Sequence, residues 1–389
     1  MKAPGDALLL RAVAALALAS AVSLGLARFS YALLLPAMRG DLGWSYLTAG
    51  AMNTLNAAGY LIGALLAPRW FAAHDARRVM LVGGFATALL LVAHGAVRSD
   101  AALYALRWAA GLASAASFVG GGLLAARLAS ASDGRSGLVL GVYYGGTGLG
   151  LIASALMVPP LLSQGSADWP SAWIAMGVLA LLATALTLAG TRGQGAPPRR
   201  GSPRVRLPLR RYAWGLAAYL LFGLGYIGYM TFVITLLGER GWSGGAVTAF
   251  YVLLGVGVIA SSWLWSGLLQ RQRGGVPLAL FNCLLAVATL LPVWSSQPAA
   301  VYLSGALFGG MFLSVVAATT ALVRHNAAPA AWPAGIAAFT TVFAAGQIIG
   351  PTLIGAVADG PGGLARGFVV SAAALGLGSL AALRQKPLS

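Results

Sequence analysis

The chain has 389 residues, of which 59% are hydrophobic and only 8% are charged. Soluble domains carry about 25% charged residues, so this chain cannot cover a water-facing surface and most of its surface must face lipid. The net charge of +17 comes from short basic runs between apolar segments and not from one basic face, which excludes a nucleic-acid partner.

Twelve apolar segments are long enough to cross a bilayer, which takes about 20 residues each. We therefore predict an all-α integral membrane protein with twelve transmembrane helices. In chain order, the predicted spans are 9–37, 46–68, 79–97, 101–127, 136–162, 171–191, 212–238, 246–269, 276–294, 299–323, 333–357 and 366–384.

The distribution of Lys and Arg predicts the orientation of these spans. If the N-terminus is cytoplasmic, nineteen of the 25 basic residues lie on the cytoplasmic side, two lie inside helices (Arg28 and Arg107), and four lie on the opposite side: Arg39, Arg98, Arg240 and Arg366. Cytoplasmic loops are enriched in Lys and Arg. We expect a multi-pass protein of the cytoplasmic (inner) membrane with both termini in the cytoplasm.

A basic connector over residues 192–211 separates two six-helix bundles, 1–191 and 212–389. The connector contains seven arginines and four prolines and no acid. It is either a solvated loop that follows the positive-inside rule or a segment that attracts anionic membrane lipid.

The two bundles repeat each other at an offset of 198 residues, which places residue 25 on residue 223. Gly43-Trp44-Ser45 falls on Gly241-Trp242-Ser243, and Tyr31 falls on Tyr229. Because six spans separate the partners, the halves have the same orientation in the membrane. This is a parallel repeat about an axis along the membrane normal.

These features resemble the major facilitator superfamily of transporters over the whole chain. Arg107-Trp-Ala-Ala-Gly111 is similar to the Arg-x-x-x-Gly element of the family's fourth helix, and Gly346-Gln-Ile-Ile-Gly350-Pro351 is similar to its gating helices. Residues 27–38, ARFSYALLLPAM, resemble the YbfB/YjiJ-like group. The resemblance implies a central cavity lined by helices 1, 4, 7 and 10 that opens alternately to each side.

Arg28 and Arg107 are the informative residues, because a charge at a helix centre costs at least about 2.5–3.5 kcal/mol. At 1.5 Å per residue they lie roughly 15 Å and 9 Å below the outer surface. Every acidic residue falls in a loop or at a predicted helix end, so a substrate anion is the natural partner of a guanidinium. The alternative is that either arginine braces helices through backbone carbonyls.

Several further polar residues are candidates for the substrate site. Tyr31 lies one turn from Arg28, and Tyr226 and Tyr229 are the repeat counterparts of this pair; they either bind substrate or pack as ordinary aromatic residues. Gln347 is a candidate on helix 11, with interhelical hydrogen bonding as the alternative. His94, which we expect in an exposed setting at the outer end of helix 3, is a candidate proton relay.

Two features argue against other chemistry. Gly145–Gly150 resembles a dinucleotide loop but lies inside an apolar span, so we expect helix packing instead. We predict that Cys283 is a small buried residue. The sequence shows no metal-ligand cluster and no catalytic constellation, so we expect no cofactor and no enzyme.

The functional hypothesis is a secondary active transporter of a small organic anion, a carboxylate, by alternating access and with proton symport or exchange. Arg28 is the main charge partner and Arg107 assists. The alternative is a multidrug or amphiphile exporter of the same fold. We expect a functional monomer.

Overall fold

The structure is a computed structural model that describes residues 6–132, 135–162, 168–195 and 208–388. Throughout these residues the chain forms helices and short connections, with no strand. The helices of the N-terminal half are α1 (Asp6–Ser20), the π-helix η1 (Ala21–Phe29), α2 (Tyr31–Leu42), α3 (Tyr46–Ala73), α4 (Ala76–His94), α5 (Asp100–Ser130), α6 (Ser136–Leu162) and α7 (Trp169–Gly190).

The second half begins with a short 3-10 helix and continues in the same way. Its elements are η3 (Leu209–Tyr212), α8 (Ala213–Glu239), α9 (Gly244–Leu264), α10 (Ser266–Arg271), α11 (Val276–Trp294), α12 (Pro298–Asn326), the 3-10 helix η4 (Pro329–Ala331), α13 (Trp332–Ala358) and α14 (Gly363–Leu383).

The predicted spans and the observed helices correspond one to one. Eleven helical segments of the described chain are long and apolar enough to cross a membrane. The twelfth, α3, is 28 residues long and carries Asn53 and Asn56. Two spans are more irregular than predicted, because the first contains the π-helix η1 and the eighth breaks at Trp265 between α9 and α10.

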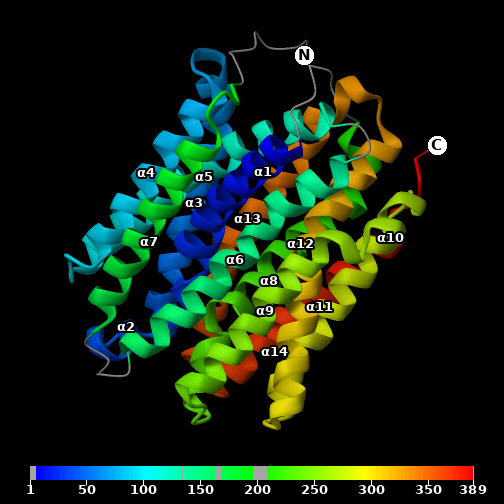
Figure 1. Cartoon of the computed structure of the whole chain (residues 1–389). Coiled ribbons are helices and arrows are strands. Elements are labelled where there is room, and N and C mark those ends of the chain that lie inside the picture. The colour runs from blue at the N-terminus through cyan, green and yellow to red at the C-terminus, as the bar shows by residue number, and fades with distance from the viewer. Residues whose placement is uncertain (1–5, 133–134, 163–167, 196–207, 389) are drawn as a thin grey trace.

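The helices of the N-terminal half and those of the C-terminal half pack side by side (Figure 1). The most extensive contacts between the halves are those of α6 with α9, of α3 with α13 and of α2 with α8. Both termini lie at the same end of the bundle, called the termini end below; the opposite end is the far end. Most of the predicted basic connector, residues 196–207, lies outside the described residues.

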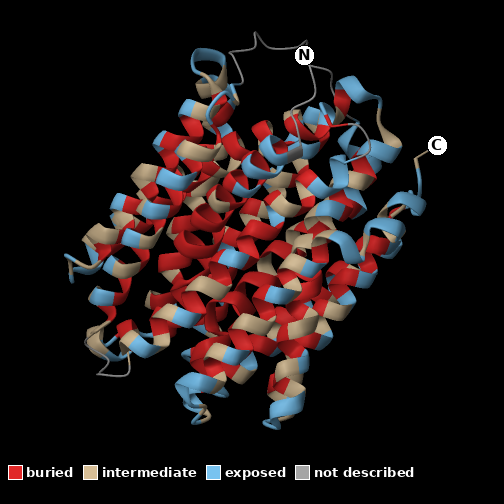
Figure 2. Ribbon diagram, in the orientation of Figure 1, coloured by how far each residue is buried: buried red, intermediate tan, exposed pale blue. Residues whose placement is uncertain are grey.

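Buried residues concentrate along the middle of the bundle, and exposed residues lie on its periphery and ends (Figure 2). Many exposed residues are large and apolar, such as Leu182, Leu186 and Leu377 at 59%, 61% and 58% exposure. This is the surface of a protein whose solvent is lipid. Cys283 is exposed, so the prediction that it is buried was wrong: hydrophobicity cannot separate a lipid-facing position from an interior one when both surroundings are apolar.

The repeat appears in the geometry of the turns. Gly43 and Gly241 end the first and seventh spans with left-handed backbones, at φ values of 66° and 76°. Glycine adopts this conformation without a Cβ penalty. Ser45 and Ser243 then cap the next helices through hydrogen bonds to the backbone N–H three residues on.

Close helix packing within each half also follows the repeat. A Cβ built on Gly59 would lie 2.0 Å from the Trp108 carbonyl oxygen, and one on Gly257 would lie 3.1 Å from the Ala306 oxygen. Residues 108 and 306 are equivalent at the 198-residue offset.

The glycine run of α6 lies inside that helix and packs against its neighbours. Gly146 contacts the backbone of Ala17, and Gly148 contacts the backbone of Gly255. This confirms the prediction of helix packing at Gly145–Gly150.

Candidate functional site

Arg28 lies near the end of a π-helical turn in the first span. All nine residues of η1, Ala21–Phe29, are buried. The Ser30 N–H donates to the Gly25 carbonyl at 3.0 Å, five residues back instead of the four of an α-helix. A Cβ on Gly25 would lie 2.5 Å from the Cα of Gly150, so α6 approaches the backbone closely here. π-Helical geometry is rare and is frequently found at functional sites.

The Arg28 side chain is 4% exposed, and its Nη2 atom has no hydrogen-bond partner among the described residues. Its guanidinium carbon lies 5.5 Å from the ring centroid of Tyr60 and 5.9 Å from that of Phe29. The ion pairs found in the described chain are Arg39–Glu239 and Arg98–Asp41. Arg28 is therefore a buried cation beside aromatic rings, with a free donor.

Arg107, in contrast, has protein partners on both terminal nitrogens. Its Nη1 donates to the Ala27 carbonyl at 2.7 Å, and its Nη2 donates to Asn53 Oδ1 at 2.9 Å. The guanidinium also lies 5.0 Å from the Tyr31 ring and 5.7 Å from the Trp173 ring. Arg107 is 0% exposed, and it joins α5 to the first span and to α3.

Asn53 continues this network into the other half. Its Nδ2 donates to Thr231 Oγ1 at 2.9 Å, and Thr231 donates to the Ile227 carbonyl at 2.6 Å. A related link starts in the C-terminal half, where the Tyr251 hydroxyl donates to the Phe29 carbonyl at 2.6 Å. At the 198-residue offset, residue 251 is the counterpart of Asn53 and residue 29 is the counterpart of Ile227. The two links between the halves are therefore related by the repeat.

Tyr31, one turn from Arg28 in the sequence, packs its ring on Arg107. Its hydroxyl donates to the Ala49 carbonyl at 2.8 Å. The counterpart Tyr229 shares a hydrogen bond with Ser304 at 2.6 Å.

Tyr226 and Gln347 lie together in an aromatic stack of the C-terminal half. Gln347 Nε2 donates to the Tyr226 hydroxyl. The Tyr226 ring stacks on Phe222, Phe312 and Phe343, with centroids 4.7, 6.0 and 5.7 Å away.

The stack meets Arg28 across the seam between the halves. Phe29 makes an edge contact with Phe312 at 5.6 Å, Phe312 stacks on Tyr226, and Arg28 lies over the ring of Tyr60. The structure thus brings together Arg28, Tyr226 and Gln347 of the predicted site.

Sequence reasoning missed the aromatic side chains that complete this site: Tyr60, Phe312 and Phe343. The sequence did carry one signal for an aromatic face on the neighbouring helix α8. Its aromatic residues at 219, 222, 226 and 229 repeat at spacings of three and four, which places them on one side of the helix. Tyr60 had no such signal, since it depends on how α3 packs against η1.

His94 was expected in an exposed setting, and this was wrong. It is 0% exposed and its ring stacks on Trp173 at 4.5 Å. Its Nδ1 lies 2.6 Å from the Leu90 carbonyl, and its Nε2 has no partner within the described chain. The last turn of α4 is covered by α7, which the linear sequence does not reveal.

Polar contacts join the two halves at the far end of the seam. The Asp359 carboxylate accepts from the backbone N–H groups of Tyr46 and Leu47 at 2.7 and 2.9 Å, at the first turn of α3. Arg39 pairs with Glu239 at 3.8 Å, and the Tyr46 hydroxyl also donates to Glu239. Each contact joins one half to the other.

Comparison with known proteins identifies the family. The family model described as "Uncharacterised MFS-type transporter YbfB" matches residues 20–383. No curated protein matches the sequence.

Solved structures share the fold at low sequence identity. A bacterial homolog of the human lysosomal transporter Spinster, inward-facing and unoccupied, has a TM-score of 0.71 at 14% identity and covers 98% of this chain and 99% of its own. A point mutant of the nucleoside transporter NupG gives 0.74 at 14%, covering 97% and 99%. The human organic anion transporter MFSD10 (TETRAN) gives 0.65 at 17%, covering 97% and 99%.

The twelve-helix fold, the parallel repeat and the match over residues 20–383 agree, and the chain belongs to the YbfB-like family of MFS-type transporters, as a multi-pass membrane protein.

Proposed function

We propose that the protein is a secondary active transporter of a small organic anion, a carboxylate attached to an apolar or aromatic body. The observation that carries this proposal is the Arg28 side chain, which is buried, has an Nη2 without a partner among the described residues and lies beside aromatic rings. A buried charge is costly unless it is paired. A substrate carboxylate supplies the missing charge and accepts from the guanidinium fork.

The two arginines take different roles in this proposal. The terminal nitrogens of Arg107 are occupied by Ala27 and Asn53, so Arg107 positions the first span and α3 around Arg28. The two charges interact electrostatically, and no ion pair to either occurs within the described residues. Together they make the interior of the N-terminal half positive, which assists anion entry.

The aromatic stack of the C-terminal half supplies the apolar side of the site. Tyr226, Phe312 and Phe343 lie within reach of one another, and Gln347 orients the Tyr226 hydroxyl. A substrate with an apolar body gains from contact with these rings. The solved neighbour MFSD10 bears the printed name of an organic anion transporter, which is compatible with this class of substrate.

Transport by alternating access requires the seam between the halves to open on either side in turn. The contacts at Asp359 and at Arg39–Glu239 hold the far end closed. We assign the termini end to the cytoplasm on the distribution of basic residues, so the bundles 1–191 and 212–389 form an inward-facing state of a monomer in the inner membrane.

Energetics constrain the coupling. Moving one negative charge inward against an inside-negative potential costs about 2.3 kcal/mol per 100 mV. Import therefore requires proton symport, for instance as the protonated substrate carboxylate, or exchange for another anion. Efflux runs with the potential.

The first test is thermal unfolding of the purified protein with benzoate, butyrate and the lipophilic cation tetraphenylphosphonium, on wild type and on Arg28→Ala. A ligand at 100 times its Kd adds about 2.7 kcal/mol of stability. We expect benzoate to stabilise wild type most and Arg28→Ala not at all. Counterflow of labelled benzoate in proteoliposomes then establishes a carrier.

The aromatic stack also favours a second candidate, an exporter of amphiphiles or multiple drugs. Stabilisation by tetraphenylphosphonium alone, or an unchanged benzoate response in Arg28→Ala, rejects the anion proposal in favour of this one.

A further inference from the structure

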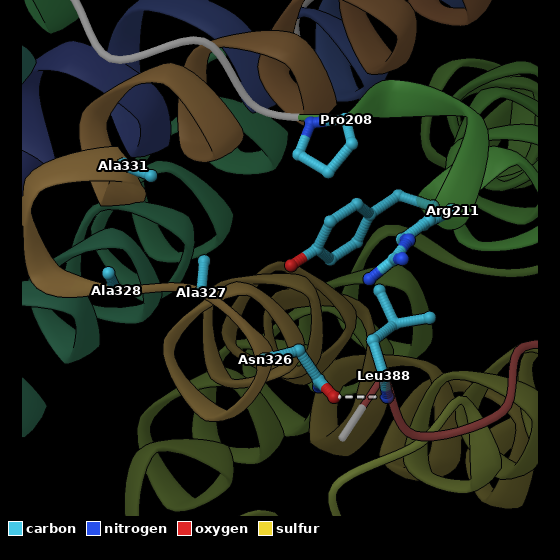
Figure 3. Close-up of a pocket in the computed structure, with 8 residues that line it drawn as sticks. Pro208, Arg211, Asn326, Ala327, Ala328, Ala331 and Leu388 are labelled. Carbon is cyan, nitrogen blue, oxygen red and sulfur yellow. Dashed lines mark hydrogen bonds between the residues drawn. The ribbon is translucent and has the colours of Figure 1, made fainter.

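A pocket lies at the termini end of the C-terminal half, at the opposite end of the bundle from the polar contacts of Asp359. Its volume is about 190 Å³, several times the roughly 30 Å³ that one water occupies in the liquid. Its walls come from three segments that are distant in sequence: the start of the second half (Pro208, Arg211), the connection from α12 to α13 (Asn326, Ala331) and the C-terminal tail (Leu388) (Figure 3).

The walls are held by hydrogen bonds that use up their own polar groups. Asn326 Nδ2 donates to the Arg273 carbonyl at 2.7 Å, and its Oδ1 accepts from the Leu388 N–H at 2.6 Å. Gln385 donates to the Arg211 carbonyl at 3.1 Å and accepts from the Gly215 N–H at 3.0 Å. The pocket is therefore preorganised, because its walls are joined to one another.

Two side chains that line the pocket have donor groups that are not used by the described residues. The Tyr212 side chain is 1% exposed, and its hydroxyl has no hydrogen-bond partner there. A buried hydroxyl without a partner is costly and indicates a missing ligand or water. Arg211 is exposed and lines the same pocket, and the ion pairs of the described chain do not involve it.

The charges around the pocket select an anion. The acids of the second half that the structure describes, Glu239 and Asp359, are both at the far end. From Tyr212 to Glu239 the helix α8 spans roughly 40 Å at 1.5 Å per residue. The segments that form the pocket are, in contrast, rich in basic residues close by in sequence or hydrogen-bonded to the walls: Arg210, Arg273, Arg324, Arg384 and Lys386.

Tryptophan residues place the pocket at the membrane boundary. Arg324 lies over the Trp332 ring at 4.8 Å, and Arg384 lies over the Trp214 ring at 4.9 Å. Trp214 is 45% exposed. Tryptophan is enriched at the depth of lipid headgroups, and basic pockets at this depth bind anionic headgroups.

We propose that this pocket binds a phosphate group, of an anionic phospholipid or of a soluble phosphate, through the Arg211 guanidinium and the Tyr212 hydroxyl. Both groups donate to phosphate oxygens, and charge-assisted bonds of this type are strong. The bound phosphate joins the start of the second half to the α12–α13 connection and to the C-terminal tail. The site does not contact Arg28 and is independent of the transported substrate.

The test uses the full-length protein in phosphatidylcholine nanodiscs with increasing phosphatidylglycerol, and in detergent with inorganic phosphate against chloride at equal ionic strength. Thermal unfolding is the readout. We expect one or both phosphate sources to raise the Tm of wild type. Stabilisation by phosphatidylglycerol alone identifies a lipid site, and stabilisation by inorganic phosphate alone identifies a soluble ligand.

Two arginine variants test whether phosphate binds in this pocket or is only attracted to the basic surface around it. Arg211→Ala is expected to weaken binding about tenfold or more, because it removes a charge-assisted hydrogen bond to the phosphate. Arg210→Ala removes the same charge one residue away, from a side chain outside the pocket lining, and is expected to weaken binding about fivefold at most, the general effect of one basic residue near an anionic surface.

Tyr212→Phe keeps the ring contact with Phe339 and removes only the hydroxyl. We expect it to weaken phosphate binding several-fold without lowering the Tm of the ligand-free protein, because the hydroxyl has no partner among the described residues. The proposal is overturned if Arg210→Ala and Arg211→Ala weaken phosphate binding equally, or if neither phosphate source raises the Tm of wild type.

Discussion

Residues 28 and 226 are equivalent in the repeat, yet one is arginine and the other tyrosine. Both lie next to the seam between the halves. Arg28 is a buried cation whose Nη2 finds no partner in the described chain, whereas Tyr226 is part of a stack of rings and accepts from Gln347. The same backbone thus presents charge from one half and apolar surface from the other.

A second pair of equivalent positions shows the same difference. Arg107 corresponds to Gly305, at which a Cβ would lie 2.8 Å from the Phe250 ring. In the N-terminal half a guanidinium fills the space between helices, and in the C-terminal half an aromatic ring does. The two bundles therefore share the positions of glycines and turns, but the side chains that pack between their helices differ.

The largest expected effect comes from making position 28 like position 226. Arg28→Tyr is expected to weaken carboxylate binding by between about 30-fold and several thousand-fold, since removing one partner of a buried charge pair costs about 2–5 kcal/mol. Tyr226→Phe keeps the aromatic stack and is expected to weaken carboxylate binding only several-fold. Equilibrium binding of labelled benzoate measures both. Equal affinities in wild type and Arg28→Tyr contradict the assignment of charge to the N-terminal half.

The two arginines are expected to differ in their effect on folding. Arg107→Leu is expected to lower the free energy of unfolding by about 3 kcal/mol, because it removes two charged hydrogen bonds. Arg28→Leu, measured without ligand, is expected not to lower it, because Nη2 has no partner among the described residues. Unfolding in detergent separates them, and a larger loss in Arg28→Leu reverses the proposed roles.

The gate at the far end is expected to respond to the loss of one charge. Asp359→Asn weakens the cap on α3 by about 1 kcal/mol. We therefore expect the fraction of molecules that are open at the far end to rise about fivefold. Ala49→Cys in a Cys283→Ser background reports this opening, because Ala49 is 0% exposed when the gate is closed. The readout is the rate of labelling by a membrane-impermeant maleimide. A rate that Asp359→Asn leaves unchanged shows that Asp359 does not hold the gate.

The smallest effects are expected at the two related links across the seam. Tyr251→Phe removes one bond, worth about 0.6 kcal/mol on average inside membranes. Asn53→Ala is expected to cost more than that, because it also unpairs Arg107. Unfolding free energies of the two variants and of the double variant test this. Equal effects at 53 and 251 contradict the asymmetry of the two halves.

The candidate site was predictable in part. Arg28 and Arg107 stood out because charges are expensive in apolar spans, and Tyr226 followed from Arg28 through the repeat. Tyr60, Phe312 and Phe343 did not stand out, because aromatic residues are common in membrane helices and only packing decides which of them meet. His94 was misplaced for the same reason, since the neighbour that covers it, α7, is distant in sequence.

The sequence by itself determined the class of the molecule. Hydrophobic segments long enough for a bilayer and the 198-residue repeat are properties of the linear chain, and backbone hydrogen bonding in lipid leaves such segments little choice but helix. Which side chains share a space was decided by the tertiary structure. The packing of the helices put the Tyr31 ring against Arg107, and among the described residues it left Nη2 of Arg28 without a partner while both terminal nitrogens of Arg107 found one. Those outcomes depend on distances between helices, which no local pattern encodes.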